Sequence, residues 1–166
     1  MRPNILYPLF VSVDAIKGIG VKYCKLIKKL CGERIIDALF HLPVNIIDRT
    51  YNPPLKQAQD GKIWTGVVTI TEHQAPSSKK HPYRVYCTDG TANIVLVFFK
   101  IYSDSIQKNY PIGAKRVISG KLEYFNGMWQ MSHPEYTTTP DKLNTIARLE
   151  PVYPLTAGVT NKLMNM

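Results

Sequence analysis

Two glycines set between lysines, in the run Lys17-Gly18-Ile19-Gly20-Val21-Lys22, have residue types and spacing suited to binding phosphate. A turn of this kind leaves backbone N–H groups free at the start of the next helix, where they can hold a phosphate group. Lys22 would add a cation that displaces counterions from a nucleic acid. The run therefore predicts a helix-hairpin-helix-like contact with the DNA backbone through Gly18, Gly20 and Lys22. The alternative is an ordinary interhelical turn beside a solvated lysine face.

Aromatic side chains gather in residues 61–136. They are Trp64, Tyr83, Tyr86, Phe98, Phe99, Tyr102, Tyr110, Tyr124, Phe125 and Trp129. Exposed rings within a basic groove bind single-stranded nucleic acid by stacking on its bases. For any single ring, burial in the core is the more frequent explanation. Because side chains alternate along a strand, Phe98 and Phe99 must point in opposite directions. We expect Phe99 at an exposed strand end, close to Lys100 and Tyr102.

Signatures of catalysis and of metal binding are absent from the sequence. It contains no GxxxxGK[ST], HExxH or GxSxG pattern. The three cysteines, Cys24, Cys31 and Cys87, form no CxxC pair and are expected to be reduced and structural. The four histidines, His41, His73, His81 and His133, have no ligand-like spacing to the cysteines. We therefore expect no catalytic residue, no zinc site and no other metal site.

The elements that must position these residues begin with a helical part, residues 1–50. After Gly20, Tyr23, Cys24, Ile27 and Leu30 recur at helical spacing and mark one face, and Lys22, Lys25 and Lys29 share another. A second helix is predicted from Glu33 to His41. Its inward-facing residues are expected to be Ile35, Ile36, Leu39 and Phe40.

From about Gly61 the pattern changes to alternation typical of strands. Five strands are predicted, at 64–71, 83–88, 92–100, 116–123 and 128–132, with hairpin turns at Asp89-Gly90 and Asn126-Gly127. Ile101–Gly113 has room for a short helix or a loop. The sequence thus predicts a mainly β chain with a helical N-terminal part and a five-stranded, antiparallel OB-type barrel at 61–136. An antiparallel sandwich is the alternative, and 137–166 are expected to form a strap or linker.

Charge favours a polyanionic partner. The 166 residues carry 21 Lys and Arg against 12 Asp and Glu, a net charge of +9 without a basic tail. Such a surplus favours nucleic acid or an anionic membrane surface, and a merely soluble basic protein is the alternative. The longest wholly apolar run, Ile94–Phe99, is far too short to span a membrane. We expect a cytoplasmic protein with no membrane partner.

Ordered blocks along the chain resemble the RecG family of ATP-dependent branched-DNA helicases. They are Ile16-Lys-Gly-Ile-Gly-Val21, Ile36-Asp-Ala-Leu-Phe-His-Leu-Pro43, Ile47-Asp-Arg49, Thr88-Asp-Gly-Thr91, Val97-Phe-Phe-Lys100, Ser119-Gly-Lys121, Met131-Ser-His-Pro-Glu-Tyr136 and Pro151-Val-Tyr-Pro154. They follow the family's order, and the matches cover about residues 16–158. The resemblance implies an OB-fold wedge domain that splits a replication fork or a Holliday junction, in DNA repair and recombination.

The resemblance also implies roles for particular residues. In the family, a phenylalanine at the end of the matching strand stacks on the base pair at the branch point, and Phe99 has that position here. Tyr102 is the nearest match to a second ring, with Ser103 as the alternative. Lys100 replaces the family's asparagine and becomes a candidate phosphate contact. Further candidates on the basic face of the barrel are Lys115, Arg116 and Lys121.

Partners and cofactors follow from the same resemblance. The family's two motor domains follow the wedge, and none of their motifs occurs here, so we expect a chain truncated before the motor and inactive alone. ATP and magnesium would be needed only by the motor domains. Branched DNA, those motor domains and a single-strand-binding protein are the expected partners of a monomeric chain. The alternatives are a standalone single-strand-binding OB protein, and a gene remnant or protein-interaction module.

Overall fold

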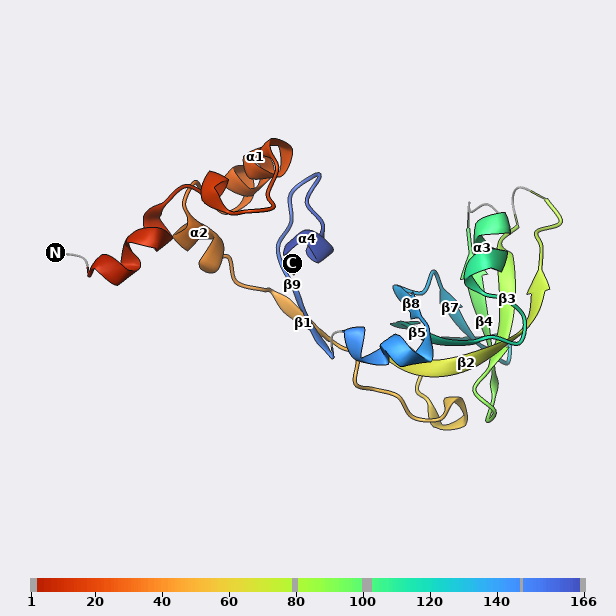
Figure 1. Cartoon of the computed structure of the whole chain (residues 1–166). Coiled ribbons are helices and arrows are strands. Elements are labelled where there is room, and N and C mark those ends of the chain that lie inside the picture. Colours follow the sequence, from red (N-terminus) through yellow and green to blue (C-terminus); the bar gives the residue numbers. More distant parts are fainter. Residues whose placement is uncertain (1–2, 79–80, 100–102, 147, 165–166) are drawn as a thin grey trace. The chain divides into compact units, whose positions relative to one another are not determined.

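The chain folds into two compact units, residues 1–47 with 150–166 and residues 48–149 (Figure 1). The structure is a computed structural model that describes residues 3–78, 81–99, 103–146 and 148–164. Residues 137–166, expected from the sequence to form one strap, are divided between the two units. None of the described helices has the length and apolar character needed to cross a membrane.

The first unit is mainly helical. Its helices are η1 (Asn4–Phe10), η2 (Val13–Ala15), α1 (Val21–Leu30), α2 (Ile35–Leu39) and α4 (Asn161–Met164). β1 (Asn45–Asp48) and β9 (Leu149–Val152) form a two-stranded sheet. A small core of Val13, Cys24 and Ile27 joins η2 to α1. Helical packing, rather than the sheet, therefore stabilises the part of the unit that carries the two glycines.

The predicted helices are confirmed, but their buried faces are confirmed only in part. Cys24 and Ile27 of α1 are buried, and its lysine face is exposed as expected. The prediction that Leu39 and Phe40 point inward is wrong, since they are 60% and 75% exposed. The reason is the length of α2, which ends at Leu39 after five residues and cannot present a full apolar face. Tyr23 of α1 is also exposed.

The second unit is built on one mixed sheet. Its strands are β2 (Ile63–Gln74), β3 (Tyr83–Thr88), β4 (Asn93–Phe98), β5 (Lys115–Lys121), β6 (Glu123–Phe125), β7 (Met128–Ser132) and β8 (Tyr136–Thr138). The strand order is β6-β7-β4-β3-β2-β5-β8. The helical elements are η3 (Leu55–Gln57), α3 (Ser103–Asn109) and η4 (Pro140–Thr145). The chain is therefore mainly β with a helical N-terminal part.

The predicted strands are found as β2, β3, β4, β5 and β7, but the described sheet has seven strands instead of five. The predicted strand 116–123 is interrupted at Leu122, which separates β5 from β6, and β8 follows β7. An all-antiparallel sheet is also wrong, because β4 and β7 pair in parallel. The long connection through α3, β5 and β6 returns the chain in the same direction.

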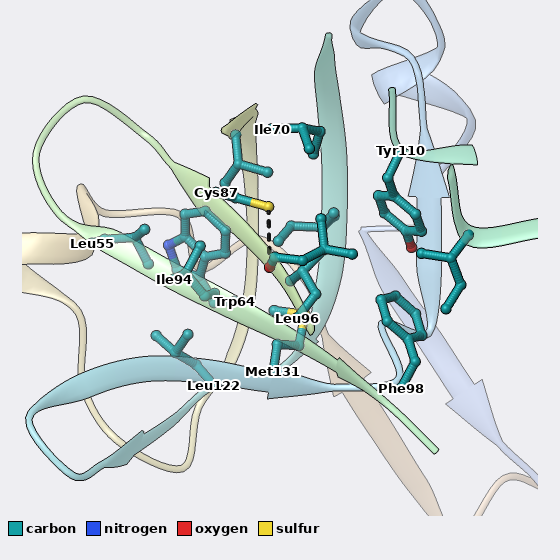
Figure 2. Packing of buried hydrophobic residues seen from close by; sticks show 14 of the residues in the cluster. Leu55, Trp64, Ile70, Cys87, Ile94, Leu96, Phe98, Tyr110, Leu122 and Met131 are labelled. Atoms are coloured by element: carbon teal, nitrogen blue, oxygen red, sulfur yellow. Dashed lines mark hydrogen bonds between the residues drawn. The ribbon is translucent and has the colours of Figure 1, made fainter. Parts of the chain in front are cut away.

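The core of this unit is formed by buried side chains of β2, β3, β4, β5, β7 and α3, together with Leu55 and Leu122 (Figure 2). Trp64, Ile94, Leu96, Leu122 and Met131 are all at most 2% exposed. The indole N–H of Trp64 donates to the carbonyl of Pro53 at 2.9 Å. This bond satisfies the polar atom of the bulkiest core residue and attaches the segment before β2 to the sheet.

Both predicted hairpin turns are confirmed. At Asn126-Gly127, φ is +50° and +79°, and the two residues join β6 to β7 as a tight turn requires. At Asp89-Gly90, the Asp89 carboxylate accepts hydrogen bonds from the backbone N–H groups of Leu55, Thr91 and Ala92 at 2.7–3.0 Å. One carboxylate thus ties η3 to the β3–β4 turn.

The Asp89 carboxylate should make the stability of the sheet unit depend on acid. Partial burial raises its pKa, but the backbone donors of Leu55, Ala92 and Thr91 outweigh burial and hold the pKa below its usual value. The stabilisation is therefore present above the unfolded pKa of about 4 and lost as pH falls through the folded pKa. At pH 7, Asp89→Asn should cost about 1–2 kcal/mol of unfolding free energy.

Thermal melts of the wild type and Asp89→Asn between pH 7 and pH 3 would check this expectation. The difference between the two proteins should shrink as the solution becomes more acidic. A difference that stays the same at pH 3 would show that the charge of Asp89 is unimportant.

Candidate nucleic-acid interface

The two phenylalanines at the end of β4 point in opposite directions, as alternation predicts. Phe98 is 7% exposed and packs on Tyr110, with ring centroids 5.4 Å apart (Figure 2). Phe99 is 49% exposed and is the first residue beyond the strand. The buried ring of Phe98 anchors the strand end, and the neighbouring ring of Phe99 is available for stacking.

His133, just after β7, contacts the exposed phenylalanine. The backbone N–H of Phe99 donates to Nε2 of His133 at 3.0 Å, and the two ring centroids lie 5.7 Å apart. The backbone N–H of His133 donates to the Val97 carbonyl at 3.0 Å, which extends the β4–β7 pairing by one residue. The position of Phe99 therefore depends both on β4, which it follows, and on His133, which follows β7.

The other residues expected beside Phe99 are Lys100 and Tyr102. Both lie outside the described residues. Ser103, the alternative position for the second ring, begins α3. Of Phe99, Lys100 and Tyr102, the structure therefore describes Phe99.

The three basic residues of β5 are not brought together. Lys115 and Lys121 stand at opposite ends of the strand, about 20 Å apart at the usual rise per residue, and Arg116 faces the other side. Arg116 donates to the Asn109 carbonyl at 2.8 Å and so caps α3. Lys121 Nζ lies 3.1 Å from Glu123 Oε1. Lys115 is exposed.

The glycine-containing turn has the open backbone that an anion requires. Gly18 has φ +91°, and Gly20 is the N-cap of α1. A Cβ at either glycine would meet no described atom within 4 Å. The first turn of α1, all of it described, contains no acidic residue, and Lys22 is exposed. These residues belong to the helical unit, whereas Phe99 and the β5 cations belong to the sheet unit.

An exposed aromatic hairpin was not singled out from the sequence. Tyr124 and Trp129 pair across β6 and β7 with ring centroids 4.8 Å apart, and Tyr124 and Phe125 are 54% and 60% exposed. Tyr124 and Trp129 line a pocket of about 590 Å³, together with Lys56 and Asn93. The sequence signal that could have identified this hairpin was the Asn126-Gly127 turn, because it places the rings on either side of it at the tip of a short hairpin.

The buried ionisable groups of the sheet unit have structural roles. The Arg49 guanidinium, 4% exposed as a residue, binds Glu135, donates to Ser119 Oγ at 3.1 Å and lies 4.6 Å from the Tyr136 ring centroid. Burial raises the pKa of the Cys87 thiol to about 12, so this group is neutral and unreactive at physiological pH. Neither arrangement indicates catalysis.

A mainly β unit with an exposed aromatic tip, joined to a helical unit with a lysine face, fits the class of nucleic-acid-binding modules. The model of the RecG wedge domain family matches residues 12–166. The chain belongs to the RecG wedge domain family.

Curated relatives and a solved structure agree with that family. The chain is 28% identical over 144 residues to the ATP-dependent DNA helicase RecG of Aquifex aeolicus, covering 87% of this chain and 18% of the relative. It is 25% identical over 154 residues to the Escherichia coli K12 enzyme of that name, covering 90% and 22%. The structure of RecG bound to a three-way DNA junction matches with a TM-score of 0.73 at 21% identity, covering 94% of this chain and 22% of that chain. The chain thus spans about a fifth of the length of these relatives.

Proposed function

We propose that the chain is a wedge module that binds branched DNA, with the Phe99 ring stacked on the base pair at the branch point. The observation that carries this proposal is the half-exposed Phe99 ring at the end of β4, next to a buried Phe98. A ring fixed on a sheet can replace the stacking partner that the last base pair loses at a branch. Family membership supports the same role, since RecG in the matched structure is bound to a three-way junction.

We further propose that the sheet unit forms an OB-type barrel. β5 pairs with β2, β6 pairs with β7, and only Leu122 separates β5 from β6. A Cβ on Gly120 would lie 2.9 Å from the sulfur of Met131, so β5 and β7 approach each other closely. A small barrel closes when one continuous strand pairs with both edges of a sheet. Such closure would make a rigid support for Phe99.

The phosphate contacts are proposed to come from both units. In the sheet unit, Lys115 is exposed, while Arg116 and Lys121 already bind protein groups. In the helical unit, Gly18, Gly20 and Lys22 would hold a phosphate at the start of α1, with Lys25 and Lys29 following along the same face. These contacts would supply affinity without base specificity.

The chain is proposed to act as part of a larger helicase in DNA repair and recombination. Motor domains using ATP and magnesium would pull the duplex arms across the module, which itself would only bind. A monomeric, cytoplasmic protein that also contacts a single-strand-binding protein fits this role. Strand separation would then depend on the rigidity of the sheet unit.

Fluorescence-anisotropy titrations test the proposal. The 166-residue chain would be titrated at one salt concentration against a three-way fork, a linear duplex and a single strand of matched length. We expect tighter binding to the fork than to either linear DNA. Equal affinity for all three would contradict the proposed function.

Removal of lysines should have a different effect from removal of the ring. Lys115→Ala should weaken binding to fork and duplex equally and lower the slope of log K against log salt by about 1. The triple variant Lys22→Ala, Lys25→Ala and Lys29→Ala should lower that slope by about 2–3 if the lysine face of α1 binds phosphates. Titrations from 50 to 200 mM salt measure both slopes. Lys142→Ala, an exposed lysine of η4, serves as the control. An unchanged slope would exclude phosphate contacts by the substituted residues.

The aromatic hairpin favours a second candidate function, binding of single-stranded nucleic acid. The exposed ring of Tyr124, which lines the pocket, and the exposed ring of Phe125 next to it in sequence could stack on unpaired bases, each contact being worth about 1–3 kcal/mol. This function predicts that the single strand binds at least as tightly as the fork. It also predicts that Tyr124→Ala with Phe125→Ala weakens binding more than Phe99→Ala does.

A further inference from the structure

We propose that His133 is the positioning residue for Phe99: it fixes both the backbone and the ring of the exposed phenylalanine. The proposal rests on the proposed stacking function of Phe99 and adds a specific device to it. Because Phe99 lies just beyond β4, the hydrogen bonds within that strand do not by themselves hold its ring in place. The side chain that follows β7 supplies the missing contact.

The hydrogen bond between them determines the state of the imidazole. The backbone N–H of Phe99 points at Nε2 of His133 over 3.0 Å, and a backbone N–H can only donate. Nε2 must therefore carry the lone pair, and the neutral ring must carry its proton on Nδ1. The geometry thus requires one particular tautomer of His133, which can be observed directly.

The imidazole also lies between the buried ring and the exposed ring. Its centroid is 5.8 Å from that of Phe98 at an interplanar angle of 86°, and 5.7 Å from that of Phe99 at 35°. Phe98 in turn packs on Tyr110 in the core. A continuous series of ring contacts therefore joins the core to the exposed phenylalanine, and it limits the orientations that the Phe99 ring can adopt.

The backbone of His133 is held in a conformation that its sequence disfavours. Its φ is +47°, in the left-handed region that residues other than glycine seldom adopt, and the next residue is Pro134, which restricts it further. Two bonds to the end of β4 hold it there: one from its own N–H to Val97, and one to its ring from Phe99. Such a conformation persists only where the surroundings impose it, as at functional sites.

A fixed ring matters because stacking on DNA requires one orientation. A ring that rotates freely must be ordered on binding, and that ordering reduces affinity. His133 would hold the Phe99 ring in one orientation before DNA binds. Loss of the His133 side chain should therefore reduce fork preference only while the Phe99 ring is present.

Two substitutions separate the side-chain contacts from the backbone strain. His133→Gly accepts the positive φ but removes both the acceptor and the ring, whereas His133→Gln restores an acceptor at about the distance of Nε2. We expect His133→Gly to reduce the preference for fork over duplex about two- to tenfold, the range for ordering one side chain. His133→Gln should recover part of that preference. A melting curve for each variant would confirm that the chain is folded.

The dependence on Phe99 is the decisive readout. In the Phe99→Ala background, His133→Gly should change fork preference no further. An equal loss in both backgrounds, or full preference in His133→Gly, would overturn the positioning role.

If Phe99→Ala itself leaves fork preference intact, the proposed function fails instead. In that case the tautomer of His133 still tests its hydrogen bond with the Phe99 backbone. ¹⁵N spectra of the imidazole should show the proton on Nδ1, and a proton on Nε2 would refute that hydrogen bond.

Discussion

Replacing Phe99 by alanine is expected to weaken binding to a three-way fork by about tenfold, with little change on linear duplex. A ring stacked on a base contributes about 1–3 kcal/mol, which corresponds to about 5- to 150-fold in the dissociation constant. The half-exposed ring is not part of the buried core cluster, so the substitution should leave the chain folded. The salt dependence of binding should also stay the same, because stacking releases no counterions.

Phe125→Ala is the matched control, since Phe125 is an equally large, 60% exposed ring of the same sheet. It should leave the preference for fork over duplex unchanged. Anisotropy titrations of both variants on both DNAs, at several salt concentrations, give the comparison. Equal losses on fork and duplex in Phe99→Ala would contradict a role at the branch point.

Gly66→Ala is expected to destabilise the sheet unit strongly. Trp64 and Gly66 are two residues apart on β2 and share a face, and the indole ring occupies the space beside the glycine. A Cβ at position 66 would lie 2.2 Å from two ring atoms of Trp64, which is 2% exposed and has nowhere to move. Overpacking of a core costs about 1–3 kcal/mol, and we expect a loss near 3 kcal/mol.

A second substitution tests whether this clash is the cause. Trp64→Phe removes the outer ring that the new Cβ would meet, at the cost of the hydrogen bond to Pro53. In that background, adding Gly66→Ala should cost less than about 1 kcal/mol, as expected for coupled neighbours. Urea unfolding curves of the four proteins measure the cycle. A cost of Gly66→Ala that is the same with either residue at position 64 would exclude the indole as the cause.

The sheet was largely predictable because its signals are local. Alternation of apolar residues along β2 to β4 and the Asn126-Gly127 turn depend on neighbouring residues alone. The break at Leu122, the parallel pairing of β4 with β7 and the strand β8 depend on contacts between distant segments, which one sequence does not specify. The exposure of Leu39 and Phe40 has a similar origin, since periodicity cannot show that α2 ends after five residues.

The candidate site was predictable to the same extent. Alternation indicated that Phe98 and Phe99 point in opposite directions, and the expectation that Phe99 is the exposed ring is confirmed. Nothing local indicated that His133, 34 residues further on, would bind the Phe99 backbone. Likewise, the three β5 cations look equivalent in sequence, and only the contacts of Arg116 with Asn109 and of Lys121 with Glu123 distinguish them from Lys115.

Photo-crosslinking from position 99 tests the central claim most directly. A benzophenone analogue of phenylalanine would replace Phe99 in the full chain, and the same analogue at Phe125 would serve as the control. After irradiation on a three-way fork, the crosslinked nucleotides would be mapped by primer extension. The account predicts crosslinks from position 99 at the nucleotides that flank the branch, and fewer there from position 125. Crosslinks spread evenly along the duplex arms, or no more at the branch than from position 125, would contradict it.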